Sequence, residues 1–530
     1  MSGGREVHFR GANPSGSRGE PERLAPRDPH GKDHITGPAF LLVAGRTVGL
    51  ITTFAIGPLL ARLLTLEELG TYRTFFLLYA TCFGLAQLGL AESLYYFVPR
   101  QPQRAGRYGA NAALTLTLSG LACLGVLWLA RTRIAEHFSN PDLPRYLLLL
   151  GTFLTLMLVT TVFEILMVSR KRHLNAAVTY ALSDLTRTAF FVIPALLFVS
   201  LDAVFTGAVA FAALRLVVMV LILRRAFGDV RPDLGLWRTQ LGYALPFALA
   251  VSVEVILVTY HQYVVGGSFD RATFAIYSTA CMTIPLVDLI MTSTTSVMMV
   301  KMAEDSADRH LSLSLFHETV ARLGFLLLPV GIGLSVLAQP FIVGLFTDKF
   351  QAGVPIFSVW ALTVLPAIVA VDAVLRAYAQ TRWLLAMNLV RLTFVVALIG
   401  WFLDAFGLVG AVLVTLLGTV VAKTFALVRV SRLLDVGLGD VLPWPALARL
   451  TLRAAAAAIP AWATATAFAA VPIVAFAAGA CVYGMTYLVL CYAPGIAEPA
   501  AIRLPVFQRG ADLLRSARAS LTRLAPQGGR

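Results

Sequence analysis

The chain has 530 residues, of which 58% are hydrophobic and 14% are charged, and its mean hydropathy is +0.77. This composition excludes an ordinary soluble globular protein, in which about a quarter of the residues are charged. The net charge of +14 would indicate a nucleic acid partner in a soluble protein, but here the basic residues flank apolar runs. We therefore expect membrane lipids and no nucleic acid as partners.

Apolar runs of roughly twenty residues recur about fourteen times, and each is long enough to cross a bilayer core of about 30 Å as a helix. A helix also satisfies its own backbone hydrogen bonds in lipid. The sequence therefore predicts an all-α polytopic membrane protein with about 14 transmembrane helices. The predicted spans are 38–64, 75–98, 108–130, 146–168, 176–199, 203–223, 243–265, 273–300, 325–337 with its flanks, 354–378, 383–403, 407–428, 450–471 and 473–492.

Arginine is concentrated in alternate breaks between the spans, which predicts the orientation of the chain. Cytoplasmic connections carry an excess of Lys and Arg, so both termini and the 170–172 connection are predicted to be cytoplasmic. The predicted outer connections are poorer in basic residues, and 131–145 is the exception. The other basic residues of the predicted outer side are Arg73, Arg271 and Lys349.

A short internal similarity predicts two lobes. The sequence LGTY at 69–72 follows the first span and FAIY at 274–277 follows the seventh, so the repeat unit holds six spans. The predicted division is a disordered cytoplasmic tail without a signal peptide (1–37), a six-helix lobe (38–223), a cytoplasmic linker (224–242), a second six-helix lobe (243–428), a second cytoplasmic linker (429–449), two extra helices (450–492) and a basic cytoplasmic tail (493–530).

Sequence motifs for catalysis, metals and nucleotides are missing. The five cysteines fall within predicted spans without paired spacing, and no GxxxxGKS/T, HExxH, CxxC or GxSxG sequence occurs. We therefore predict no catalytic residue, no metal, no cofactor and no enzymatic activity. A membrane glycosyltransferase or polymer ligase would normally need an extended polar outer loop, and the longest predicted outer stretches, 131–145 and 338–353, are short.

Several stretches resemble one known group of transporters. They are LARLLTLEELGTY at 60–72, LGLAESL at 88–94, FVP at 97–99, PFIVGLFT at 340–347 and AYAQ at 377–380. These residues are similar to the oligosaccharide flippases of the multidrug/oligosaccharidyl-lipid/polysaccharide exporter (MOP) superfamily. The likeness covers roughly 38–440 and consists of packing and turn patterns, so it identifies the fold more firmly than the cargo.

The resemblance implies two six-helix lobes around a central cavity, plus two C-terminal helices. It implies alternating-access transport of an undecaprenyl-diphosphate-linked oligosaccharide across a bacterial cytoplasmic membrane, for exopolysaccharide or lipopolysaccharide biosynthesis. A polysaccharide polymerase or export machinery is the implied protein partner. A drug/cation antiporter of the same superfamily is the alternative, and the membrane glycosyltransferase or polymer ligase is a more distant one.

Charged residues inside the predicted spans are the candidate site residues, because a charge at the bilayer centre costs about 2.5 to 3.5 kcal/mol and tends to face a cavity or a partner. Arg46, Arg215 and Arg391 are candidates for binding the diphosphate, since a guanidinium offers bidentate donors. The alternatives are snorkelling to the interface or an ion pair between helices. Lys423 is expected to snorkel to the inner surface.

Four other groups are candidates for binding a coupling ion. They are the carboxylates Glu92, Glu254 and Asp288, together with His261, which lies seven residues from Glu254 on one helix face. Hydrogen bonds between helices are the alternative role. Two ion pairs are expected from their spacing along a helix: Asp184 with Arg187 and Asp372 with Arg376.

Overall fold

The computed structural model describes residues 52, 54–169, 173–226, 230–304 and 308–492. Within these ranges the regular elements are all helical and there is no strand, which confirms the predicted all-α class. Arg46, the 170–172 connection and both predicted tails lie outside the described residues, together with much of the first predicted span.

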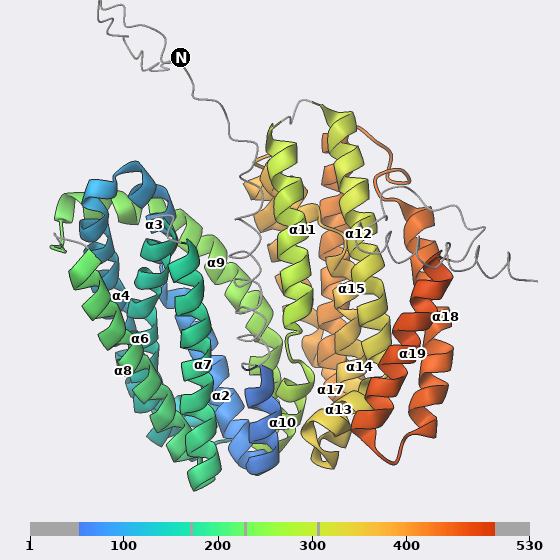
Figure 1. Ribbon diagram of the computed structural model, residues 1–530, viewed down its shortest axis with the longest axis horizontal. Helices are drawn as coiled ribbons and strands as arrows, with labels where there is room; N and C mark the ends of the chain where they lie inside the picture. Colours follow the sequence, from blue (N-terminus) through green and yellow to red (C-terminus); the bar gives the residue numbers. More distant parts are fainter. Residues whose placement is uncertain (1–51, 53, 170–172, 227–229, 305–307, 493–530) are drawn as a thin grey trace, which may run out of the picture.

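The first lobe is the bundle drawn from blue to green in Figure 1, and it follows a short apolar helix at Phe54–Leu63. Its second helix begins at a capping box, in which the Thr65 hydroxyl accepts a hydrogen bond from the Glu68 N–H and the Glu68 carboxylate accepts one from the Thr65 N–H. The elements of this lobe are α2 (Leu66–Ala86), α3 (Leu90–Arg100), η1 (Pro102–Arg104), α4 (Ala105–Leu129), α5 (Arg131–His137), α6 (Leu143–Ser169), α7 (His173–Phe198) and α8 (Leu201–Ala226).

The second lobe stands beside the first, and α9 lies between them (Figure 1). Aspartate side chains cap the N-termini of its first two helices, Asp233 for α9 and Asp270 for α10. The elements are α9 (Leu234–Ser268), α10 (Arg271–Ala280), α11 (Pro285–Glu304), α12 (Arg309–Val336), α13 (Ala338–Phe346), η2 (Asp348–Gly353), α14 (Val354–Leu362), α15 (Val364–Ala367), α16 (Val371–Ala377) and α17 (Thr381–Leu434). Two further helices, α18 (Trp444–Ala467) and α19 (Pro472–Tyr492), pack against α12 at the far side of this lobe.

Eight helices of the described chain are long and apolar enough to cross a membrane, or up to ten if each of two bent pairs is one span. One of the eight, α17, has 54 residues and contains a kink at Gly407, whose φ is 58°. A glycine adopts this left-handed backbone without the steric cost of a Cβ, so α17 covers two predicted spans, 383–403 and 407–428. The exact number of fourteen remains a prediction.

Three predicted spans are broken helices, where continuous ones were expected. The span at 75–98 is divided between α2 and α3 at a bend of 42°, the span at 273–300 between α10 and α11, and the span at 354–378 among α14, α15 and α16. Neighbouring side chains bind carbonyls at the breaks: Ser119 Oγ donates to Ala86 O at 2.9 Å, Trp360 Nε1 to Met282 O at 2.9 Å, and Lys423 Nζ to Val369 O at 3.0 Å. These bonds replace helical partners that water cannot supply in lipid.

The two lobes touch at the lower end of Figure 1, where α2 packs against α10. A Cβ added to Gly70 would lie 2.0 Å from the carbonyl oxygen of Arg271, so only glycine allows this approach. Beside it, the Arg271 guanidinium bonds to Asp142 at 2.6 Å and to Glu67 at 2.9 Å. These groups belong to connections that the sequence places on the outer side.

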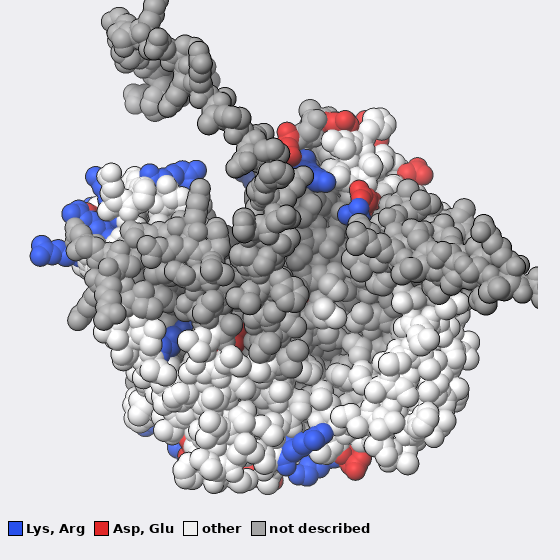
Figure 2. Space-filling view, viewed as in Figure 1, with Lys and Arg blue, Asp and Glu red and all other residues white. Residues whose placement is uncertain are grey.

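Figure 2 shows Lys, Arg, Asp and Glu mainly at the upper and lower ends of one face, and the described residues visible between these ends are mostly of other kinds. Such a band matches the hydrocarbon core of a bilayer flanked by charged interfaces. The described helices and their surface therefore have the organisation of a multi-pass membrane protein.

Candidate functional site

A polar cavity of about 590 Å³ lies in the second lobe, between α9, α11, α16 and α17. A volume of this size is typical of sites for small molecules or molecular headgroups. Six charged side chains line it: Glu254 on α9, Asp288 on α11, Asp372 and Arg376 on α16, and Arg391 and Lys423 on α17. The sequence predicted Arg391, Glu254 and Asp288 as candidates separately, and the fold brings all three to one cavity.

Arg391 has a guanidinium nitrogen that the described chain does not satisfy. Its Nε is buried without a hydrogen-bond partner there, and the carboxylates of Asp372 and Glu254 line the same cavity. A buried donor without a partner costs free energy. The predicted role of Arg391 in binding an anion stays a prediction, and the structure places the residue at a cavity that could hold one.

Lys423 and Asp372 form an ion pair between α17 and α16. The Lys423 ammonium lies 2.5 Å from a carboxylate oxygen of Asp372, and the two side chains are 15% and 35% exposed. The expectation that Lys423 snorkels to the inner surface is wrong, because Asp372 and the backbone carbonyl of Val369 hold it at the cavity wall. Asp372 likewise pairs with Lys423 instead of the predicted Arg376.

Trp360 on α14 lines the same cavity and is held in place by its neighbours. Its indole N–H is bonded to the Met282 carbonyl at the α10–α11 break, and its ring centroid lies 5.5 Å from that of His261. His261 is buried, and its Nδ1 lies 2.7 Å from the Tyr277 hydroxyl. The predicted candidate His261 is thus part of the support behind Trp360 and does not line the cavity.

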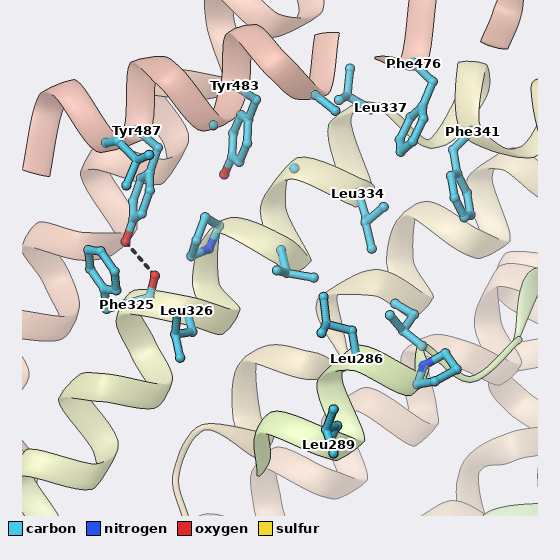
Figure 3. A pocket seen from close by; sticks show the side chains of 18 of the residues that line it. Leu286, Leu289, Phe325, Leu326, Leu334, Leu337, Phe341, Phe476, Tyr483 and Tyr487 are labelled. Atoms are coloured by element: carbon cyan, nitrogen blue, oxygen red, sulfur yellow. Dashed lines mark hydrogen bonds between the residues drawn. The ribbon is translucent and has the colours of Figure 1, made fainter. Parts of the chain in front are cut away.

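A second cavity, of about 700 Å³, is almost wholly apolar. Figure 3 shows leucine, phenylalanine and tyrosine side chains from α11, α12, α13 and α19 around it. Helix α11 contributes to both cavities, since Asp288 and Met291 line the polar one, whereas Leu286 and Leu289 line the apolar one. One helix therefore separates a charged cavity from a hydrocarbon-like cavity.

The other predicted candidates lie away from the polar cavity. Arg215 is a partly buried residue of α8, with one guanidinium nitrogen 3.9 Å from the Met157 sulfur. Glu92 is in the first turn of α3, and one of its carboxylate oxygens is buried without a hydrogen-bond partner among the described residues. Neither residue lines either cavity. The predicted pair of Asp184 and Arg187 is present, at 2.9 Å.

Sequence reasoning missed Trp360, the role of Lys423 and the apolar cavity. Asp372 and Lys423 are 51 residues apart, so no local spacing indicates their pairing. The residues around the apolar cavity look like any lipid-facing or core residue in sequence. In the described part of the chain, no group of three or more His, Cys, Asp or Glu side chains could hold a metal ion.

Comparison with known families decides the relationship of the chain. A family model described as "Polysaccharide biosynthesis protein" matches residues 59–355, more than half of the sequence. The chain belongs to this polysaccharide biosynthesis family. A search of curated protein sequences found no match.

Solved structures share the fold of this family member. The lipid II flippase MurJ in an inward closed conformation has a TM-score of 0.71 and 14% identity, over 85% of this chain and 98% of that one. An inward-facing multidrug resistance MATE transporter of the MOP superfamily has a TM-score of 0.59 and 14% identity, over 74% and 98%. A mutant of the Vibrio cholerae MATE transporter VcmN has a TM-score of 0.52 and 12% identity, over 76% of this chain and 98% of that one. The predicted MOP superfamily fold is confirmed.

Proposed function

We propose that the protein is a flippase that carries a lipid-linked oligosaccharide, of the undecaprenyl-diphosphate type, from the cytoplasmic to the outer leaflet of a bacterial cytoplasmic membrane. The observation that carries this proposal is the pair of cavities on either side of α11, one charged and one apolar. A lipid-linked sugar has a charged, hydroxyl-rich headgroup and a hydrocarbon tail. The two cavities offer each part of such a cargo a matching environment.

In the polar cavity, Arg391 and Arg376 are the groups proposed to bind the diphosphate. Guanidinium groups form bidentate, charge-assisted hydrogen bonds with phosphate oxygens. Lys423 is already neutralised by Asp372, so it contributes less net charge to a ligand. Binding and release need no change in a covalent bond, which fits transport and agrees with the flippase and the transporter that share this fold.

Transport by alternating access requires the contact between the lobes to open. Arg271 forms ion pairs with Glu67 and Asp142. The side chains of these two acidic partners are 63% and 52% exposed to solvent. Exposed pairs contribute about 0 to 1 kcal/mol each. Breaking these two ion pairs as the lobes separate would therefore cost little free energy.

Arg46 remains a proposed further contact for the diphosphate, because it is an arginine in an otherwise apolar predicted span. Arg46→Ala should greatly reduce polysaccharide export at normal membrane levels, and Arg46→Lys should restore part of it. Full export by Arg46→Ala would leave Arg391 and Arg215 as the cationic candidates.

The proposed orientation places both termini in the cytoplasm. We expect a membrane-impermeant thiol reagent outside intact cells to label Lys349→Cys, which is in the exposed η2 segment, and to spare Lys171→Cys. The reverse labelling pattern would invert the orientation and with it the direction of transport.

The test of function compares variants of Arg391 for surface polysaccharide export in cells that depend on this protein. Arg391→Ala should lower export at least about tenfold, since loss of one partner of a buried charge contact costs about 2 kcal/mol or more. Arg391→Lys should recover part of it. Arg131→Ala, which removes a partly exposed arginine stacked on Trp128 and outside both cavities, is the control. Normal export by Arg391→Ala at equal protein level would contradict the proposal.

A drug/cation antiporter is the second candidate, favoured by Glu254 and Asp288, whose exposed carboxylates face the same cavity. Glu254→Gln distinguishes the roles. If Glu254 binds a coupling ion, this variant should fold normally and change how transport depends on a proton or sodium gradient. Efflux of organic cations by the purified protein, with no movement of lipid-linked sugar, would favour the antiporter.

A further inference from the structure

The charges of the polar cavity are separated by helix. Arg376 lies on α16, and Arg391 and Lys423 lie on α17. The carboxylates Glu254 and Asp288 lie on two other helices, α9 and α11. The remaining carboxylate, Asp372, is engaged by Lys423, so the cations and the carboxylates without an ion pair in the described chain lie on different helices of the cavity.

We infer that this separation orients the headgroup and selects its first sugar: the diphosphate binds the α16–α17 wall, and the sugar beside it lies on Trp360 with its hydroxyl or amino groups toward Asp288 and Glu254. The inference rests on the proposed function and deepens it by naming the class of sugar. The cavity should accept neutral or amino sugars at this position and reject uronic acids.

Asp288 gives the selectivity its chemical basis. Its side chain is exposed at the cavity, and no ion pair of the described residues includes it. An ionised carboxylate only accepts hydrogen bonds, so it favours hydroxyl, amide or ammonium donors of a sugar. A uronate at the same place would set two carboxylates together, and like charges at close range repel.

The hydroxyl groups around the cavity add to this preference for donors. Thr295, Thr415 and Thr419 each donate to a backbone carbonyl of their own helix, at 2.7 to 2.9 Å. Their oxygens retain lone pairs that face the ligand only as acceptors. These three hydroxyl groups therefore add acceptors, and no free donor, to the cavity.

Trp360 is suited to be the platform for the sugar ring. The indole is fixed by its bond to Met282 and by the ring of His261 beside it, so little side-chain freedom is lost when a ligand binds. The C–H groups of a pyranose face carry partial positive charge and pack on the electron-rich face of an aromatic ring. A leucine in this position would keep apolar contact but lose that face.

The test is isothermal titration calorimetry on the purified full chain with three probes: farnesyl diphosphate, and farnesyl diphosphate linked to N-acetylglucosamine or to glucuronic acid. The wild type should bind the N-acetylglucosamine probe at least about tenfold more tightly than the glucuronic acid probe. Asp288→Asn with Glu254→Gln should shrink this ratio to about threefold or less. Asp404→Asn, an exposed carboxylate outside the cavity, should leave it unchanged.

Trp360→Leu should weaken binding of the N-acetylglucosamine probe several-fold. The affinity for sugar-free farnesyl diphosphate should stay nearly the same. Equal binding of both sugar probes by the wild type would overturn the inference while the proposed function stands. Absence of binding for all three probes by folded protein would contradict the diphosphate-lipid cargo itself, and the inference would fall with it.

Discussion

Lys423 on α17 and Asp372 on α16 are joined at 2.5 Å, and Lys423 also binds the carbonyl of Val369 in the break between α15 and α16. One ammonium group thus holds a broken helix to its neighbour at the wall of the polar cavity. Breaking a buried pair leaves an uncompensated charge, whereas removing both charges together is often tolerated.

We therefore predict that Asp372→Asn destabilises the purified protein by about 1 to 3 kcal/mol, less than a fully buried pair because Asp372 is partly exposed. The double variant Asp372→Asn with Lys423→Met should be more stable than the sum of the single changes predicts. Thermal unfolding in detergent measures this, with Asp404→Asn as the control. Strict additivity would show that the pair does not brace the helices.

The hydroxyl of Tyr487 should be a stabilising contact between α19 and α12. It donates to the Phe325 carbonyl at 3.0 Å. This carbonyl has no helical donor, because the residue four positions later in α12 is Pro329, which lacks an N–H. Tyr487→Phe should lower stability by about 1 to 3 kcal/mol, the cost of an unsatisfied buried acceptor. Tyr483 on the same helix has a buried hydroxyl without a partner in the described chain, so Tyr483→Phe should cost little. Equal losses of stability in the two variants would show that the Tyr487 hydrogen bond does not stabilise the contact between α19 and α12.

Arg271 is expected to hold the outer end of the lobes together. Arg271→Ala removes its bonds to Glu67 and Asp142, so a cysteine at Thr292, in the polar cavity, should react several-fold faster with an impermeant thiol reagent added outside. Arg131→Ala in the same Thr292→Cys background should leave the rate unchanged. If the rate is the same with and without Arg271, the lobe contact does not depend on this residue.

Asp233 should make part of the stability dependent on pH. The backbone N–H groups of Leu236 and Gly235, together with Arg107, hold the pKa of Asp233 below its usual value. A lowered pKa in the folded state stabilises the protein above the unfolded pKa, about 3.9, and this contribution is lost as pH falls further through the folded value.

Asp233→Asn keeps a capping side chain but cannot ionise. Its melting temperature relative to wild type should therefore be lower at pH 6 and should approach the wild-type value below about pH 4. A constant difference between the two proteins from pH 6 to pH 3 would show that the Asp233 charge does not contribute.

Much of the fold follows from local sequence. Long apolar runs predict the spans, and the α17 kink at Gly407 falls at the start of the predicted span 407–428. Gly70, part of the motif that resembles the flippases, is the glycine that lets α2 approach Arg271. Hydropathy does not predict the break between α10 and α11, because Pro285 at the start of α11 also has the sequence context of a proline inside a continuous membrane helix.

The site is less predictable because it depends on contacts between distant segments. Arg391, Glu254 and Asp288 stand out as charges in apolar sequence, yet nothing local shows that they share a cavity. Lys423 looks like a residue at the end of a span until Asp372 is placed beside it. Trp360 has a defined role only through Met282, in the break between α10 and α11, and His261 on α9.

The most direct test of the proposed function is translocation by the purified protein in liposomes. An undecaprenyl-diphosphate-linked oligosaccharide with a fluorescent label on the sugar is placed in both leaflets, and an impermeant quencher reports movement between them. The wild type should speed translocation at least about tenfold over protein-free liposomes, and Arg391→Ala should bring it close to the protein-free rate. Folded wild-type protein that leaves the lipid at the protein-free rate would contradict the flippase assignment.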